Sequence, residues 1–317
     1  MVEIIETKCD SDLSCPPVLF TIFNRPALTK CVFERIRLAK PKSLFIAADG
    51  PRIDKVGDIR LCAEARDVIK KINWDCDVHT LYHDQNLGCK IAMSSAINWF
   101  FNHVEAGIIL EDDCAPDISF FNYCEELLEK YKNDTLIGII SGDLFLRDRD
   151  IQYSYYFSSF PHMWGWATWR RTWKNYDSSI KDWPQFRNLD WLTEKTGSEY
   201  YARIWLNIFE SVYQQQIDTW DYQVVFMLWA QSQLSIVPNR NLVSNLGFGS
   251  DSTHTQNASD RFSLIPTEKM IFPLVHPRLI FRDKEKDLLE ALVIFGSPTT
   301  LSKKILIKLK SIVGKIN

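Results

Sequence analysis

Residues 107–113 read Gly-Ile-Ile-Leu-Glu-Asp-Asp, a short apolar run that stops at three consecutive acidic residues. An apolar run of this length is typical of a strand buried in a sheet. Adjacent carboxylates at the end of such a strand repel one another unless a positive charge offsets them. Mg²⁺ or Mn²⁺ would do so, because these ions prefer carboxylate oxygens. We therefore expect a metal site at Glu111-Asp112-Asp113. A solvated acidic turn, with Asp117 capping the next helix, is the alternative.

Strand and helix patterns alternate on both sides of this stretch, over the first 145 residues. Strands are expected at 18–23, 43–48, 77–82, 107–110 and 137–141, with helices ending near 40, 72, 103 and 131. This order predicts an α/β fold with a mainly parallel central sheet flanked by helices. Such sheets bind ligands at the carboxyl ends of their strands. Asn24-Arg25 and Asp49-Gly50 each follow a predicted strand, so they should share one rim with the acidic triplet.

The second half is less regular. Helices are expected at 200–216 and 221–232, a loop at 240–251, and a dense aromatic stretch runs from Trp164 to Trp173. No internal repeat or linker separates the halves. The sequence therefore predicts a single domain over residues 1–299, divided into 16–145 and 146–260, with a helix-rich C-terminal portion.

Composition narrows the class of protein. The 317 residues are 46% apolar and 24% charged, which is ordinary for a globular chain. A net charge of −3 gives no basic footprint, so we expect no nucleic-acid partner. The eight cysteines show no zinc spacing, and neither a signal peptide nor an apolar run long enough to span a membrane is evident. These features predict a cytoplasmic protein with reduced thiols.

Residues 108–121, Ile-Ile-Leu-Glu-Asp-Asp-Cys-Ala-Pro-Asp-Ile-Ser-Phe-Phe, resemble the signature of GT-A glycosyltransferases close to N-acetylglucosaminyltransferase I. Gln85-Asn86-Leu87-Gly88 and Trp164-Gly165-Trp166 are similar to segments of bacterial family 2-like and haemolysin-like glycosyltransferases, and the resemblance spans about residues 16–256. It implies a Rossmann-like GT-A fold and a metal-dependent transfer from a nucleotide-sugar, with a UDP-sugar favoured. The acceptor would be a glycan or a polyprenol-linked lipid in surface polysaccharide or glycoconjugate synthesis.

The resemblance also implies roles for single residues. Asp113 would ligate Mn²⁺ or Mg²⁺, and Glu111 and Asp112 would contact the sugar and ribose of the donor. Arg25 would lie near the pyrophosphate, and Asp49 would bind the uracil or its ribose. From the residues alone, the alternative for Arg25 is a surface loop cation, and the alternative for Asp49 is a turn residue, since Asp-Gly-Pro is good turn chemistry.

Asn86 precedes a predicted helix together with a glycine, so this segment either lets backbone N–H groups approach a diphosphate or simply begins the helix. His254 follows a glycine-rich loop, and the resemblance implies a further metal or diphosphate ligand there. Residues 16–145 would then bind the nucleotide-sugar, and residues 146–260 the acceptor.

An inverting transferase needs a carboxylate that takes the proton of the acceptor hydroxyl. The resemblance points to Asp221, in Trp220-Asp221-Tyr222 at the start of a predicted helix. Asp at that position is also a favoured cap, and Asp218 competes for the role of base.

Trp164, Trp166 and Trp169 could form an acceptor platform, because flat rings stack on sugar faces. Core packing is the alternative, since Trp is a large apolar residue.

The last residues, 300–317, carry lysines and no acid, with apolar residues at helical spacing. They predict a basic amphipathic helix that lies on the inner face of the cytoplasmic membrane or docks on its own protein. Two rival functions stay open. One is a sugar nucleotidyltransferase, which would normally have a glycine-rich basic loop after the first strand. The other is a non-catalytic carbohydrate- or membrane-binding protein.

Overall fold

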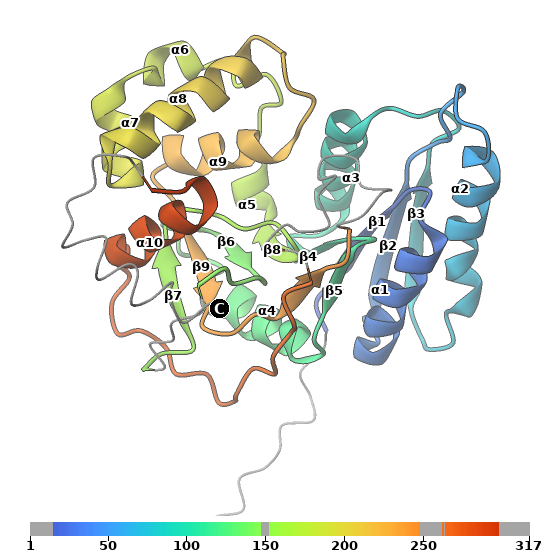
Figure 1. The fold of residues 1–317 in the computed structure, drawn as a ribbon. Helices are drawn as coiled ribbons and strands as arrows, with labels where there is room; N and C mark the ends of the chain where they lie inside the picture. Colours follow the sequence, from blue (N-terminus) through green and yellow to red (C-terminus); the bar gives the residue numbers. More distant parts are fainter. Residues whose placement is uncertain (1–14, 147–151, 248–261, 263, 298–317) are drawn as a thin grey trace, which may run out of the picture.

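The structure is a computed structural model that describes residues 15–146, 152–247, 262 and 264–297. Its centre is a sheet with the strand order β3-β2-β1-β4-β8-β6-β9-β7 (Figure 1). The strands are β1 (Val18–Ile22), β2 (Ser43–Ala48), β3 (Asp77–Tyr82), β4 (Ala106–Glu111), β6 (Ile137–Ser141), β7 (Tyr155–Ser158), β8 (Trp166–Trp169) and β9 (Leu234–Pro238). The predicted α/β architecture is confirmed.

The first four strands of the sheet, β3, β2, β1 and β4, run parallel, in register from Ser43 opposite Asp77 to Val18 opposite Ile108. The residues of β1 are all buried, because the sheet is covered on both faces. The carboxyl ends of these strands therefore meet at one rim, as the sequence predicted.

β8 departs from the parallel order. It pairs antiparallel with both β4 and β6 and so lies between two strands that run parallel to each other. Successive side chains of β8 point to opposite faces of the sheet. Trp166 enters the hydrophobic cluster on one face, and Ala167 and Trp169 enter the cluster on the other.

Helices cover both faces. The face with α1 (Pro26–Ala39), α2 (Asp58–Arg66), the 3-10 helix η1 (Asp67–Lys71) and α4 (Ser119–Lys130) buries Phe33, Val68 and Phe120. The opposite face buries Ile97 and Phe100 of α3 (Cys89–His103), with residues of α5 (Arg170–Trp173) and α9 (Asp221–Ala230).

A third hydrophobic cluster lies beside the sheet. It joins α9 to α6 (Trp183–Phe186), α7 (Leu189–Thr196) and α8 (Glu199–Tyr213), which gather at the upper left of Figure 1. Its centre is aromatic, with Trp205 5.0 Å from Trp229 between ring centroids. α9 is therefore shared, since it packs on the sheet with one side and on this helical lobe with the other.

α10 (Lys284–Phe295) is fixed by two fully buried carboxylates, Asp287 and Glu290. Asp287 accepts hydrogen bonds from Ser158 at the end of β7, and Glu290 is paired with Nε2 of His162. The other ring nitrogen of His162 lies 3.2 Å from Oδ2 of Asp143. Burial by itself lowers the pKa of His162, but the charges of Glu290 and Asp143 outweigh it and raise that pKa well above 6.5. The buried imidazole is therefore protonated at neutral pH.

Candidate active site

Arg25 and the acidic triplet meet at the rim. α1 starts at Pro26 directly after Arg25, so the side chain of Arg25 is held at the carboxyl end of β1. Its guanidinium forms an ion pair with Asp112 and a second one with Oδ2 of Asp113 at 2.9 Å. Asp112 is 2% exposed and also accepts a hydrogen bond of 3.3 Å from the backbone N–H of Phe23. Arg25 thus supplies the positive charge that the triplet was expected to need from a metal.

Burial dominates the electrostatics of the triplet. It raises the pKa of Asp112 to about 6, and Arg25 limits the rise. It also raises the pKa of Glu111, and the neighbouring charge of Asp113 adds to this effect. The charge of Asp221 contributes to the same rise in the pKa of Glu111, so the predicted base lies within electrostatic range of Glu111.

Asp49 and Asn86 hold the next two strand ends together. Oδ1 of Asp49 accepts the backbone N–H of Leu87 at 2.9 Å, and Oδ2 accepts the amide of Asn86 at 2.8 Å. A side chain at Gly50 would come within 2.4 Å of the backbone of Gln85, so the two segments touch directly. The carboxylate of Asp49 therefore fixes the loop before α3, a contact with a distant segment that the sequence did not predict. The predicted contact of Asp49 and Asn86 with the donor stays a prediction.

The second half of the chain reaches Asp113 through a small two-stranded sheet of β5 (Cys114–Pro116) and β10 (Val243–Asn245). Leu246 donates its backbone N–H to the carbonyl of Asp113 at 2.7 Å. A Cβ at Gly247 would lie 2.2 Å from Oδ2 of Asp113. Sequence reasoning missed Gly247, although the glycines of the 240–251 loop were its available signal.

Asp221 opens α9 on the same rim. Its Oδ1 accepts the hydroxyl of Thr219 and the backbone N–H of Tyr222, and Oδ2 accepts no hydrogen bond within the described part of the chain. The competitor Asp218 lies against Gly88, where a Cβ would be 3.3 Å from its Oδ2. The pKa of Cys89, raised to about 12 by burial, also responds to Glu111, Asp221, Asp218 and Asp49. These four carboxylates therefore lie within electrostatic range of the thiol of Cys89, the first residue of α3.

Two of the three tryptophans predicted for the acceptor lie in the core. Trp166 is 1% exposed and Trp169 is 3% exposed, and Nε1 of Trp169 donates to the carbonyl of Leu128 at 3.1 Å. Their faces are covered by protein, so the alternative of core packing holds for both. Trp164 is partly exposed and packs edge-on against Phe145 at 5.1 Å.

Two further expectations fall outside the described residues, namely His254 and the helix at 300–317. Within the described ranges, no group of three or more His, Cys, Asp or Glu residues is arranged to hold a metal ion by itself. In the same ranges, no helix has both the length and the apolar character needed to cross a bilayer.

No protein-family model matches the sequence, and no curated protein matches it. Among solved structures the chain is similar to HddC from Yersinia pseudotuberculosis, with 9% identity and a TM-score of 0.33 over 51% of this chain and 80% of that one. It is also similar to 4-diphosphocytidyl-2C-methyl-D-erythritol synthase from Anaerococcus prevotii, with 9% identity and a TM-score of 0.30 over 51% of this chain and 77% of that one. A UDP-glucose pyrophosphorylase complexed with UDP-glucose gives 10% identity and a TM-score of 0.29 over 50% of this chain and 78% of that one. At these scores the comparisons leave the function to be argued from the site.

Proposed function

We propose that the rim is the active site of an enzyme that uses a nucleotide-sugar. More particularly, we propose a metal-dependent, inverting glycosyltransferase of the GT-A type, with a UDP-sugar as the favoured donor. The observation that supports this proposal is the ion pairing of Asp112 and Asp113 with Arg25, together with the charge of Asp221, which acts on Glu111 from the start of α9. The residues proposed for the donor and the proposed base are therefore within electrostatic range of each other.

The charge of the rim argues for a cation that arrives with the donor. The carboxylates that interact there are Asp49, Glu111, Asp112, Asp113, Asp218 and Asp221. A diphosphate brings further negative charge, and like charges at this distance disfavour each other. Arg25 already neutralises part of the triplet, so it does not compensate the diphosphate as well. A divalent cation shared between the protein and the diphosphate removes the conflict.

Asp113 fits the role of the protein ligand. It is partly exposed, and among the described residues its Oδ1 has only the weak contact with Sγ of Cys114 at 3.4 Å, apart from the Arg25 pair on Oδ2. Mg²⁺ and related ions are commonly held by one or two carboxylates, with substrate phosphates and water filling the other positions. When bound, the cation would stabilise the negative charge of the leaving diphosphate. His254 stays a proposed additional ligand.

Asp221 would act on the acceptor. In an inverting transfer the acceptor oxygen forms a bond to the anomeric carbon while the bond from that carbon to the diphosphate oxygen breaks. The hydroxyl proton passes to a carboxylate at that moment. Asp221 suits this step, because Thr219 and the first turn of α9 hold its Oδ1 while Oδ2 is left to accept the proton. We place the acceptor, a glycan or a polyprenol-linked lipid, on this side.

A sugar nucleotidyltransferase is the second candidate, and the first loop argues against it. β1 ends at Ile22 and α1 begins at Pro26, so Phe23, Asn24 and Arg25 are the whole connection. This link has no glycine and is too short to wrap a triphosphate with backbone N–H groups. The guanidinium in it points to Asp112 and Asp113 instead.

Calorimetric titration tests the proposal. The full chain is titrated with UDP, GDP, CMP and ADP, each with and without Mn²⁺, and the same series is repeated with Asp113→Ala. We expect one nucleotide to bind in a Mn²⁺-dependent way, and this binding to be lost in the variant. Glu129→Ala, which removes an exposed carboxylate on α4 far from the rim, is the control and should bind as the wild type does. Absence of nucleotide binding under every condition would refute the proposal.

A further inference from the structure

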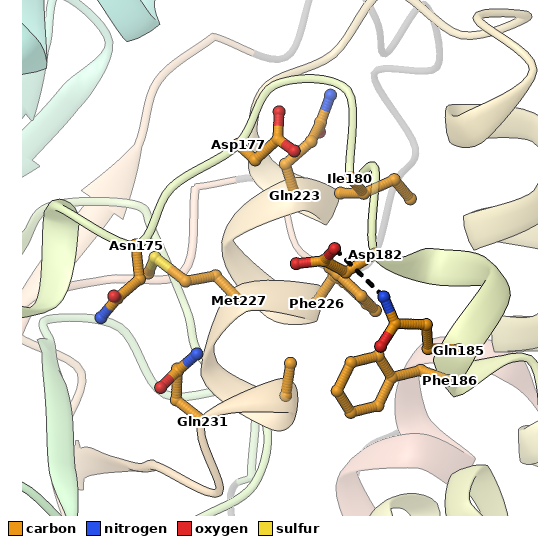
Figure 2. A pocket seen from close by; sticks show the side chains of 11 residues that line it. Asn175, Asp177, Ile180, Asp182, Gln185, Phe186, Gln223, Phe226, Met227 and Gln231 are labelled. Atoms are coloured by element: carbon orange, nitrogen blue, oxygen red, sulfur yellow. Dashed lines mark hydrogen bonds between the residues drawn. The ribbon is translucent and has the colours of Figure 1, made fainter.

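A cavity of about 260 Å³ lies along α9, between that helix, α6 and the segment that leads into α6 (Figure 2). We call it the α9 pocket. Its lining residues are Asn175, Asp177, Ile180, Asp182, Gln185, Phe186, Gln223, Phe226, Met227, Ala230 and Gln231. Its volume is just below the roughly 300–1,000 Å³ of sites for drug-sized ligands. That leaves room for a ligand of about the size of one sugar ring.

The floor and the mouth of the pocket differ in chemistry. Ile180, Phe226 and Met227 form an apolar floor and are at most 6% exposed. The mouth carries exposed amide side chains, among them Gln185 and Gln231. An apolar floor under planar amides suits a ligand that has both C–H faces and hydroxyl groups.

One buried group points to a missing partner. Gln223 is 0% exposed, and its amide nitrogen donates to the carbonyls of Thr219 at 2.6 Å and Ser178 at 3.3 Å. Its Oε1 is buried without a hydrogen-bond partner among the described residues. A buried amide oxygen normally has a partner, and here the described residues supply none, so a water or a ligand hydroxyl group would complete it.

Charge excludes several ligand classes. No lysine, arginine or histidine lines the pocket. The hydrogen bonds from Ser179 outweigh burial and lower the pKa of Asp177, so its carboxylate is ionised. Both of its oxygens accept hydrogen bonds, Oδ1 from Ser179 and Oδ2 from the backbone N–H of Lys181 at 3.0 Å. Asp182 adds a second carboxylate to the lining. An anion would be repelled, and a neutral polyhydroxylated ligand fits.

We propose that the α9 pocket is a subsite for one neutral sugar ring of a glycan chain, with Oε1 of Gln223 accepting a hydrogen bond from a ring hydroxyl group. Its place supports this assignment. Tyr176 lies between two lining residues, and its hydroxyl donates to the carbonyl of Trp220, directly before Asp221. Burial raises the pKa of Tyr176, and the charge of Asp221 adds to this rise. The pocket and the proposed base are therefore neighbours on α9. That the bound glycan is the acceptor rests on the proposed function, whereas the binding of a sugar ring does not.

Saturation-transfer NMR on the full chain without nucleotide tests the subsite. The probes are maltotriose, cellotriose and chitotriose as neutral glycans, and glucuronic acid as an anionic one. We expect saturable binding of a neutral glycan with a Kd on the order of 1 mM, as its few contacting atoms allow, and no binding of glucuronic acid. Ala230→Trp, which fills the pocket from its partly exposed rim, should abolish binding. Gln185→Ala should weaken binding by about fivefold.

The control is Gln216→Ala, an exposed amide that does not line the pocket and bonds only to the side chain of Gln214. It should leave glycan binding unchanged, as should Asp113→Ala. No saturable binding of the neutral probes, or unchanged binding in Ala230→Trp, would overturn the subsite. Loss of nucleotide binding in Asp113→Ala with glycan binding retained separates the two sites. Nucleotide binding by a chain that binds no glycan refutes the subsite and leaves the proposed function standing.

Discussion

Replacing Arg25 by methionine tests how much its guanidinium stabilises the folded protein through the ion pairs with Asp112 and Asp113. The side chains of Arg25, Asp112 and Asp113 are 21%, 3% and 14% exposed, so the ion pairs are largely removed from water. Methionine keeps most of the volume and removes the charge. The perturbation therefore leaves Asp112 buried beside Asp113 with no opposite charge.

The magnitude follows from burial. Breaking a buried pair from one side costs roughly 3–5 kcal/mol, and we expect about 3 kcal/mol because Arg25 is partly exposed.

The cost of removing Arg25 depends on pH. The pKa of Asp112 is already raised from 3.8 to about 6, so the folded state binds the extra proton between these values and stability falls as pH rises through them. Without Arg25 that pKa rises further, and stability keeps falling at higher pH. The destabilisation should therefore be larger at pH 8 than at pH 5.

Thermal unfolding at these two pH values is the assay. About 3 kcal/mol corresponds to a loss of roughly 6–12 °C in Tm for a chain of this size. Arg203→Met is the matched control, because Arg203 pairs with Glu199 on the exposed side of α8. Such surface pairs contribute about 0–1 kcal/mol, so its Tm should change by at most about 3 °C. Equal Tm values for Arg25→Met and wild type at pH 8 would refute the reasoning.

Mn²⁺ extends the same experiment. Arg25 and a cation compete for Asp113, so Arg25→Met should bind Mn²⁺ without nucleotide more tightly than wild type does. A ligand at 100 times its Kd stabilises by about 2.7 kcal/mol. Mn²⁺ at that ratio should therefore restore most of the lost Tm. Failure of Mn²⁺ to raise the Tm of the folded variant would count against Asp113 as a metal ligand.

Three further results are expected. Gly247→Ala places a Cβ 2.2 Å from the carboxylate of Asp113, so the Kd for nucleotide should rise by about tenfold or more in calorimetry. Gly197→Ala strains the left-handed residue that ends α7 but brings its Cβ within 4 Å of nothing, so it should lower stability without changing this Kd; equal effects on the Kd would contradict the assignment. The pKa of His162 is raised above 6.5, so the folded state holds an extra proton above that pH and the free energy of unfolding should fall as pH rises, by at most about 1.4 kcal/mol per pH unit from this group. Urea unfolding from pH 6 to 8 should show a shallower fall in His162→Gln than in the wild type, and equal slopes would contradict the assignment. Asp221→Asn should lower kcat for transfer by about 10²–10⁴-fold with unchanged nucleotide affinity, and an unaffected kcat would exclude it as base.

The parallel half of the fold was predictable because each strand is a short apolar run ended by turn residues. β2, β3 and β6 have the predicted bounds. The rim followed from topology alone, since parallel strands bring Arg25, Asp49 and Glu111 to one edge. What the sequence did not show is which of these side chains bind one another, because ion pairing between Arg25 and Asp112 is a contact across 87 residues.

The aromatic stretch was harder for a physical reason. Two tryptophans three residues apart suit either an exposed platform or a strand buried on both faces, and local pattern does not separate these cases. Trp166 and Trp169 belong to β8, whose two partners come from elsewhere in the chain. α10 was missed for a similar reason. Charged residues such as Asp287 and Glu290 are usually exposed to solvent, so the local sequence gives no sign that this helix packs on the core. Their partners Ser158 and His162, which make burial possible, are distant in the sequence.

The site is assembled from both halves of the chain, and this has a consequence for what each half can do. Arg25 and the acidic triplet come from the parallel strands, whereas Gly247 and Asp221 come from segments more than a hundred residues later. The backbone of Asp113 itself is paired with Leu246. The first half alone would therefore present a charged strand end without the groups that enclose it. If the α9 pocket binds the glycan, α9 carries both the proposed base, Asp221, and residues that select the acceptor. Substitutions along α9 would then change which acceptor is used and leave binding of the donor unchanged.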